Sequence, residues 1–239
     1  MKDIHNTVGA DQYLLKSIAE ELRLPLVQIS RLAELSQASK YDFASNIRSI
    51  ESSADLAIQL LESFILGVEF SDRQREIELS PITIGAVMND VAHQLHRLAS
   101  QNDYDIELSI KSAHPIMGNY EAIKMAYLNI AHTIITGDNS SDGKKRKSIV
   151  FAVYNRGPKN MAGVYGNNLQ ISKSSWEKSL AIFDRSRQKM PDFSSINGSG
   201  FFVATSILES MSLSLNPSKY RGHKGLAAAF PLSQQLQLI

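Results

Sequence analysis

The 239-residue sequence contains no cysteine. Disulfide bonds, thiolate catalysis and cysteine-ligated metal sites are therefore excluded. The sequence also lacks an apolar run of the roughly 18 to 20 residues that a membrane-spanning helix needs, and its first residues lack the apolar core of a signal peptide. A formal net charge of +1 provides no overall field that would attract nucleic acid or an anionic membrane. We therefore expect a soluble, cytoplasmic protein that binds neither nucleic acid nor membranes.

Glycine and proline are scarce in the first third of the chain, which instead carries apolar residues at helical spacing. These residues recur every three or four positions from Leu14 to Leu32 and again from Phe43 to Ile65. The pattern predicts two helices joined by a short polar connection as an antiparallel hairpin. Because a lone hairpin cannot bury both stripes, we expect two chains to form a four-helix bundle, and hence a homodimer.

The composition changes in the charged connector at 71–81, so we divide the chain into a hairpin at 1–72 and a second domain at 73–239. In the second domain we expect helices at 82–101, 119–136 and about 200–212, and strands at 104–110, 148–154, 213–217 and 225–232. Residues 156–198 are expected to be irregular, as a lid or a degenerate binding loop. The predicted fold class is α+β, a helical hairpin followed by an α/β sandwich with its helices on one face.

The segment Ala19–Leu26 reads AEELRLPL and places a proline inside a helical pattern, where proline is costly. This segment, with the order of hairpin, connector and sandwich, resembles the core of sensor histidine kinases over nearly the whole chain. In that family the first helix carries the box S-H-E-L-R-T-P-L. The resemblance implies that the sandwich is of the histidine-kinase ATP-binding (GHKL) type.

Two positions of this box depart from the family pattern. Glu20 stands at the phosphoacceptor histidine, and a carboxylate lacks the imidazole nitrogen that attacks the γ-phosphate. Leu24 stands where the family uses Thr or Asn to place a water for its phosphatase activity. We expect both activities to be absent, which leaves Glu20, Glu21, Arg23, Leu24 and Pro25 as a candidate docking site for a partner. The alternative is a solvated helix face with a kink at Pro25.

The family's asparagine box resembles the stretch GNYEAIKMAYLNIAHTIIT, within the expected helix at 119–136. Asn129 keeps the first asparagine of the box. Thr133 replaces the second, which ligates magnesium in the family, and a threonine hydroxyl is a shorter and weaker ligand for a cation that demands near-ideal octahedral geometry.

Two glycine boxes are also present in degraded form. The family's D-x-G-x-G box is matched to NRGPK, in which Asn155 could still accept a hydrogen bond from adenine and Gly157 keeps one glycine. Gly198 and Gly200 resemble the pair that opens the last helix, where backbone amides can hold phosphate. The structural alternative is that both glycines only permit a tight turn.

The resemblance implies a catalytically inactive, histidine-kinase-like signalling protein without a cofactor, which dimerises and binds a response-regulator receiver domain or another histidine kinase. One alternative is an atypical kinase or ATPase with residual ATP and magnesium binding through Asn129, Asn155 and the turn at 198–200. Another is a phosphotransfer adaptor, but that role needs a histidine where this chain has Glu20.

Three further features are expected to be structural. His93 and His96 have a spacing that could ligate a metal, but no third ligand groups with them, so we predict no metal site. The basic cluster at 144–147 is expected to be a solvated turn, because it lacks the interleaved aromatic residues of a nucleic-acid surface. Trp176 and Phe183 are expected to pack the irregular segment onto the sandwich.

Overall fold

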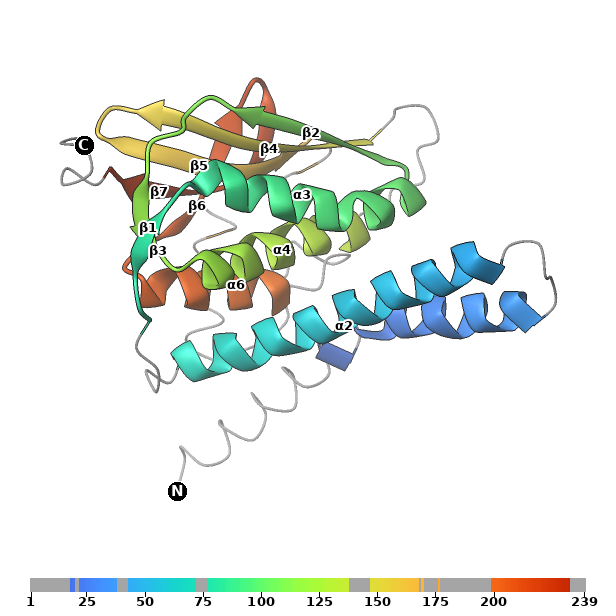
Figure 1. Cartoon of the computed structure of the whole chain (residues 1–239). Helices are drawn as coiled ribbons and strands as arrows, with labels where there is room; N and C mark the ends of the chain where they lie inside the picture. Colours follow the sequence, from blue (N-terminus) through green and yellow to red (C-terminus); the bar gives the residue numbers. More distant parts are fainter. Residues whose placement is uncertain are drawn as a thin grey trace.

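A computed structural model describes residues 18–19, 22–37, 43–71, 77–137, 147–167, 169, 176 and 199–232. After a first helix at 22–37, the elements are α2 (Phe43–Ser71), β1 (Ser80–Ile82), α3 (Ile84–Gln101), β2 (Tyr104–Ile110), β3 (Ile116–Gly118), α4 (Tyr120–Gly137), β4 (Lys147–Arg156), β5 (Lys159–Gly166), α6 (Ser199–Ser210), β6 (Leu215–Tyr220) and β7 (His223–Pro231). The first helix and α2 lie side by side as a hairpin beneath a sandwich (Figure 1). The predicted α+β fold is thus confirmed.

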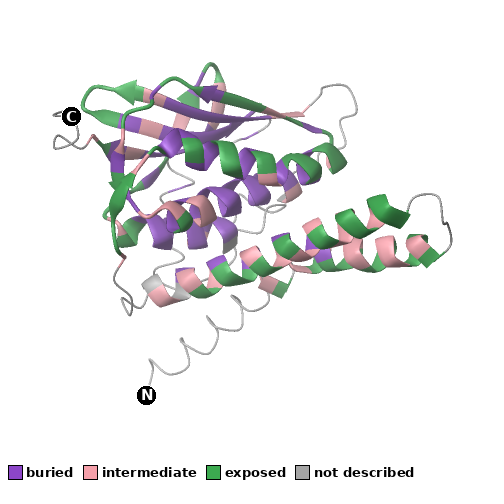
Figure 2. Ribbon diagram, in the orientation of Figure 1, coloured by how far each residue is buried: buried purple, intermediate pink, exposed green. Residues whose placement is uncertain are grey.

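Helix α2 uses two faces for different purposes. Its buried residues follow a regular three- and four-residue spacing and face the sandwich: Ser53, Leu56, Leu60, Ser63 and Gly67. Gly67 allows a close approach, because a Cβ there would lie 3.2 Å from the Val203 Cα of α6. The apolar stripe that the sequence predicted for the bundle lies elsewhere on α2, and Ile58, Leu61 and Ile65 on it are exposed. Figure 2 shows the hairpin as largely exposed or half-buried beside a buried sandwich core.

The sheet of the sandwich has five strands in the order β2-β4-β5-β7-β6. Only the β2–β4 pair is parallel, and the other three pairs are antiparallel. Helices α3, α4 and α6 cover one face of the sheet, as predicted (Figure 1). Their buried residues, among them Leu95, Ile130 and Ile207, form one core with Phe151 and Val164 of the sheet.

Strand β5 corrects the prediction that residues 156–198 are irregular throughout. It pairs with β4 from Lys159 to Gly166 and on its other side with β7. The strand lies at the centre of the sheet and is buried on both faces, so its sequence KNMAGVYG shows no alternation of polar and apolar residues. Two glycines and one asparagine within it read as a loop because these residues are depleted in strands.

On the other face of the sheet, the hairpin of β6 and β7 bends back toward β2. Tyr220, at the tip of this hairpin, lies with its ring centroid 5.1 Å from that of Tyr154 and 5.5 Å from that of Tyr165. Its hydroxyl is 2.7 Å from Ser109 Oγ on β2, although β2 and β6 are the two edges of the sheet. Gly225 of β7 permits the close approach of β7 to β5 that this bend requires, since a Cβ there would fall on the Val164 carbonyl oxygen of β5.

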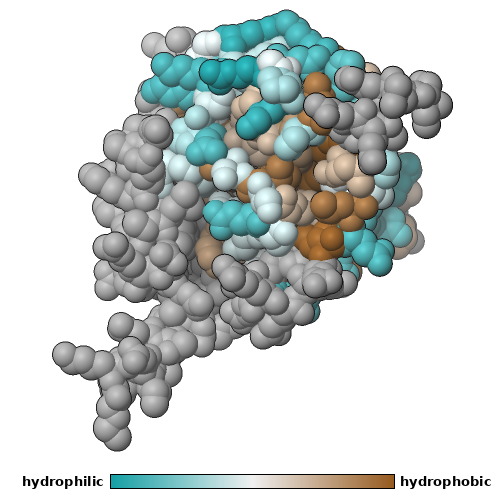
Figure 3. All heavy atoms as spheres, turned by 90° about the vertical axis from the view of Figure 1, so that its left-hand side faces the viewer, coloured by the Kyte–Doolittle hydropathy of each residue, from teal (hydrophilic) through white to brown (hydrophobic). Residues whose placement is uncertain are grey.

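A two-stranded sheet of β1 and β3, which the sequence did not predict, lies at one end of the sandwich. Each strand has only three residues, too few for a periodic pattern. Figure 3 turns this end toward the viewer and shows hydrophobic residues gathered in the middle of the face, with hydrophilic residues along its upper edge. Leu79 and Met117 at this end are exposed.

Candidate functional site

The box on the first helix is only partly described. Glu20 and Glu21 lie outside the described residues. Arg23 is exposed, whereas Leu24 is half-buried against the core and Pro25 is buried within the continuous helix at 22–37. A proline buried in a helix is held by packing, because it removes one helical hydrogen bond. Of the described candidates on this helix, Arg23 alone is exposed enough to meet a partner directly.

Asn129 of α4 is enclosed between two helices. Its side-chain nitrogen donates to Ser63 Oγ of α2 at 2.6 Å and to the Met125 carbonyl oxygen at 2.8 Å. The residue is only 2% exposed. Its amide therefore links the sandwich to the hairpin.

Thr133 lies one helical turn after Asn129 and is likewise 2% exposed. The backbone of Gly200, in the first turn of α6, packs directly on it: a Cβ at residue 200 would fall on Thr133 Oγ1 and lie 2.9 Å from the Asn129 carbonyl oxygen. Thr133 Oγ1 has no hydrogen-bond partner among the described residues. The structure thus brings Asn129, Thr133 and Gly200 together, while Gly198 lies outside the described residues.

Asn155 and Gly157 are not part of this group. Asn155 is exposed near the end of β4, and Gly157, with φ of +60°, forms the tight turn into β5. Glycine at the first central position is typical of two-residue hairpin turns. Ile134 of α4 contacts Tyr104, which pairs with Lys147 at the other end of β4. Asn155 is eight residues along the strand from there, roughly 26 Å. The reading of NRGPK as a nucleotide box is therefore not supported.

The strand end that lies toward Thr133 belongs to β5. Gly166 closes this strand opposite Ile149, near the start of β4, and Asn167 follows it. The Asn167 side-chain oxygen accepts a hydrogen bond from the Ser148 N–H at 3.1 Å. A glycine box that follows a strand and lies near Thr133 would therefore begin near Gly166, at the end of β5. Recognising β5 as a strand was the step that sequence reasoning lacked.

Trp176 packs against the base of α6, as predicted. Its ring meets that of Phe201 edge-on, with centroids 6.1 Å apart, and its Nε1–H donates to the Leu215 carbonyl oxygen at 3.1 Å. Phe183 lies outside the described residues, as do residues 144–146 of the basic cluster. The remaining member of that cluster, Lys147, lies 5.5 Å from the centre of the Tyr104 ring.

His132, next to Thr133, is a fully buried titratable group of α4. It is 1% exposed, and neither ring nitrogen has a hydrogen-bond partner among the described residues. Burial lowers the pKa of His132 from 6.5 to about 4, because the charged imidazolium cannot be solvated there. The ring is therefore neutral at physiological pH.

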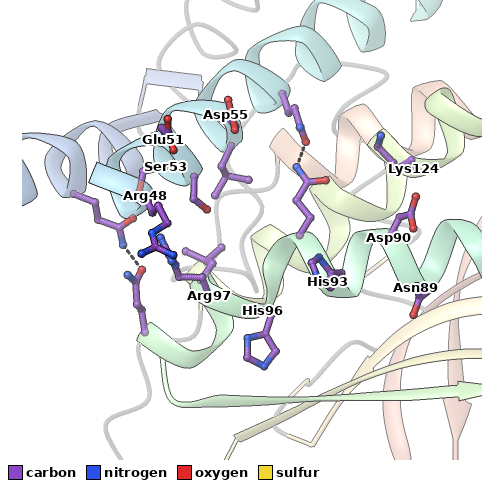
Figure 4. A pocket seen from close by; sticks show the side chains of 17 residues that line it. Arg48, Glu51, Ser53, Asp55, Asn89, Asp90, His93, His96, Arg97 and Lys124 are labelled. Carbon is purple, nitrogen blue, oxygen red and sulfur yellow. Dashed lines mark hydrogen bonds between the residues drawn. The ribbon is translucent and has the colours of Figure 1, made fainter. Parts of the chain in front are cut away.

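Two cavities lie at the border of hairpin and sandwich. One, of about 1100 Å³, separates α2 from α3, and His93 and His96 line it as exposed residues (Figure 4). The other, of about 660 Å³, lies between the end of α2 and the start of α4. In the described ranges, no cluster of three His, Asp or Glu side chains could hold a metal ion. No described helix is long and apolar enough to cross a membrane.

No protein-family model and no curated protein sequence matches this chain. Solved structures do. Acinetobacter baumannii histidine kinase AdeS is 14% identical, with a TM-score of 0.53 over 90% of this chain and 98% of AdeS. Full-length ShkA in complex with AMPPNP is 14% identical, with a TM-score of 0.54 over 94% of this chain and 46% of ShkA. The catalytic domain of histidine kinase ThkA is 11% identical, with a TM-score of 0.50 over 65% of this chain and 99% of that domain.

At such low identity these likenesses establish the fold alone. They agree with the arrangement seen in the described residues, in which a helical hairpin is followed by a five-stranded sheet with three helices on one face. The chain has the fold of a histidine-kinase core.

Proposed function

We propose that this chain is a histidine-kinase-like signalling protein that carries out no phosphotransfer and acts by dimerising and binding a partner. The partner is a response-regulator receiver domain or another histidine kinase. The cytoplasm is the compartment in which we expect it to work. The fold gives the general class, and the reasons for lost catalysis come from individual residues.

The main support is the packing around Asn129 and Thr133. A magnesium-nucleotide site needs side-chain oxygens that face an open cleft, since Mg²⁺ keeps several waters and near-ideal octahedral geometry. Here Thr133 is covered by the backbone of Gly200, and the Asn129 amide is bonded to Ser63 of the hairpin. Neither residue fits such a site in this arrangement.

The first helix supports the same proposal. Its phosphoacceptor position is Glu20, which cannot act as an imidazole nucleophile. Leu24, at the position that would place a water, is an apolar side chain half-buried against the core. Glu21, Leu22, Arg23, Pro25 and Leu26 keep the family pattern, but none of them replaces the missing imidazole as a nucleophile.

Dimerisation is supported by exposed apolar residues on both helices of the hairpin. They include Leu26, Val27 and Leu35 on the first helix and Phe43, Ile58, Leu61 and Ile65 on α2. An apolar area of this extent on one hairpin is typical of an interaction surface. Two hairpins that bury these faces against each other would form the predicted four-helix bundle.

The test is a calorimetric titration of the full chain with ATP, with and without magnesium. We expect no saturable binding. The Glu20→His variant, incubated with labelled ATP, is expected to incorporate no phosphate, because restoring the nucleophile does not restore the nucleotide site. Tight magnesium-dependent binding, or phosphate incorporation in Glu20→His, would refute the proposal and favour an atypical kinase or ATPase.

A further inference from the structure

The 1100 Å³ groove lies between the hairpin and the sandwich, with α2 and α3 as its walls (Figure 4). Two amide pairs cross between the domains along it. Gln28 Nε2 of the first helix donates to Gln101 Oε1 of α3 at 3.1 Å, and Gln94 Nε2 of α3 donates to Gln59 Oε1 of α2. The groove is therefore an interdomain site, and of the residues considered for phosphotransfer or nucleotide binding, those that the structure describes do not line it.

Two arginines face each other within this groove. Arg48 of α2 and Arg97 of α3 both line it and point toward one another (Figure 4). Both side chains are exposed, and thus open to a ligand. In the described part of the chain neither forms an ion pair, and Arg48 donates only to the Ala44 carbonyl oxygen of its own helix, at 3.3 Å. Two like charges that face each other repel, and an anion bound between them relieves that repulsion.

Three carboxylates also line the groove: Glu51, Asp55 and Asp90. Glu51 and Asp55 lie on the same wall as Arg48, yet no described ion pair joins either to an arginine. Asp90 is engaged elsewhere, because its Oδ2 accepts a hydrogen bond from the Tyr120 hydroxyl at 2.6 Å. On α3, His93 and His96 line the groove as well and add N–H donors.

We propose that the groove binds a phosphate-type oxyanion between Arg48 and Arg97. Each guanidinium presents a planar fork of donors that matches phosphate oxygens, and one multivalent anion can accept from both. Because the two arginines come from different domains, the bound anion ties α2 to α3 and holds the hairpin against the sandwich. The groove has room for a phosphorylated small molecule as well as for free phosphate.

The experiment is a thermal-shift and calorimetric titration of the full chain with inorganic phosphate, against sodium chloride of equal ionic strength. We expect phosphate to raise the melting temperature beyond the chloride control. Arg48→Gln and Arg97→Gln should each weaken binding about 10- to 100-fold, as expected for loss of a hydrogen-bonded charge. Arg31→Gln removes an exposed arginine of the first helix that does not line the groove, and should bind like the parent chain.

Titration with ribose 5-phosphate distinguishes the source of the anion, since tighter binding than free phosphate indicates a phosphorylated metabolite. A second measurement follows the two domains directly. Because the chain lacks cysteine, spin labels at Ser45→Cys of α2 and Ser100→Cys of α3 are unique, and phosphate should narrow their distance distribution. The proposal fails if phosphate acts no differently from chloride, or if Arg48→Gln and Arg97→Gln respond to it as Arg31→Gln does.

Discussion

Acid should destabilise this protein through the buried side chain of His132. Its pKa is about 4 in the folded chain, where it is buried, and about 6.5 in the unfolded chain. Between these values the unfolded chain binds a proton that the folded chain does not, so stability falls as the pH is lowered from 6.5 toward 4. Above pH 6.5 and below pH 4 this residue contributes no further pH dependence.

The size of the effect follows from the two pKa values. They differ by about 2.5, and each unit corresponds to about 1.4 kcal/mol, so His132 accounts for a total loss of about 3 kcal/mol. At pH 5, about 2 kcal/mol of this is already lost. For a domain whose free energy of unfolding is typically about 5 to 15 kcal/mol, that is a large fraction.

Urea denaturation at pH 7.5 and pH 5.0, on the parent chain and on His132→Leu, measures the effect. The substitution keeps a similar volume and removes both unpartnered nitrogens, so we expect a change of less than about 1.5 kcal/mol at pH 7.5. Between pH 7.5 and pH 5.0 the free energy of unfolding of the variant should fall by about 2 kcal/mol less than that of the parent chain. His96→Gln, at an exposed position of α3, should keep the parent's pH dependence.

One outcome would refute this reasoning. If the parent chain and His132→Leu lose equal stability between the two pH values, His132 titrates in its ordinary range. The second half of α4 would then be open to water, and the enclosure of Thr133 beside it could not be used against nucleotide binding.

Two further predictions concern the site and the dimer. Gly200→Ala should destabilise the chain by about 1 to 3 kcal/mol, because the added Cβ overpacks against Thr133. Thr133→Ala should recover part of that loss in the double variant, as measured by denaturation of the parent, both single variants and the double variant. If Gly200→Ala has no effect on stability, α6 does not pack closely on α4. Leu61→Glu, at a 44% exposed position of the α2 stripe, should weaken dimerisation about 100-fold in sedimentation analysis, because each partner would bury a carboxylate. Ser45→Glu on an exposed polar position of α2 is the matched control, and equal dissociation constants for the two variants would place the dimer surface elsewhere.

Much of the fold could be read from the sequence because its longer elements carry strong periodic patterns. Helix α3 begins at Ile84 and β2 spans Tyr104–Ile110, close to the predicted bounds. The face of α2 that meets the sandwich could not be read in the same way. Ser53, Ser63 and Gly67 follow the helical spacing, but they are small rather than apolar, so the pattern does not stand out.

The candidate site was predicted in part for a related reason. Asn129, Thr133 and Gly200 are brought together as expected, because the helices that carry them have clear sequence patterns. Asn155 lies at the far end of β4 from this group, and it was grouped with them because β5 is buried on both faces and reads as a loop. Because β5 was not predicted, the glycine box expected after a strand was assigned to the turn between β4 and β5, and not to the residues that follow β5.

The contact between Tyr220 and Ser109 has a consequence for how the protein is made. The two residues are 111 positions apart in the chain, yet they close one face of the sheet. During synthesis this face stays open until the hairpin of β6 and β7 has left the ribosome, so Val150, Ala152 and Tyr165 remain uncovered from their own synthesis until that point. Closure of this face is therefore a late event, and a nascent chain halted before residue 220 would present an apolar surface to chaperones.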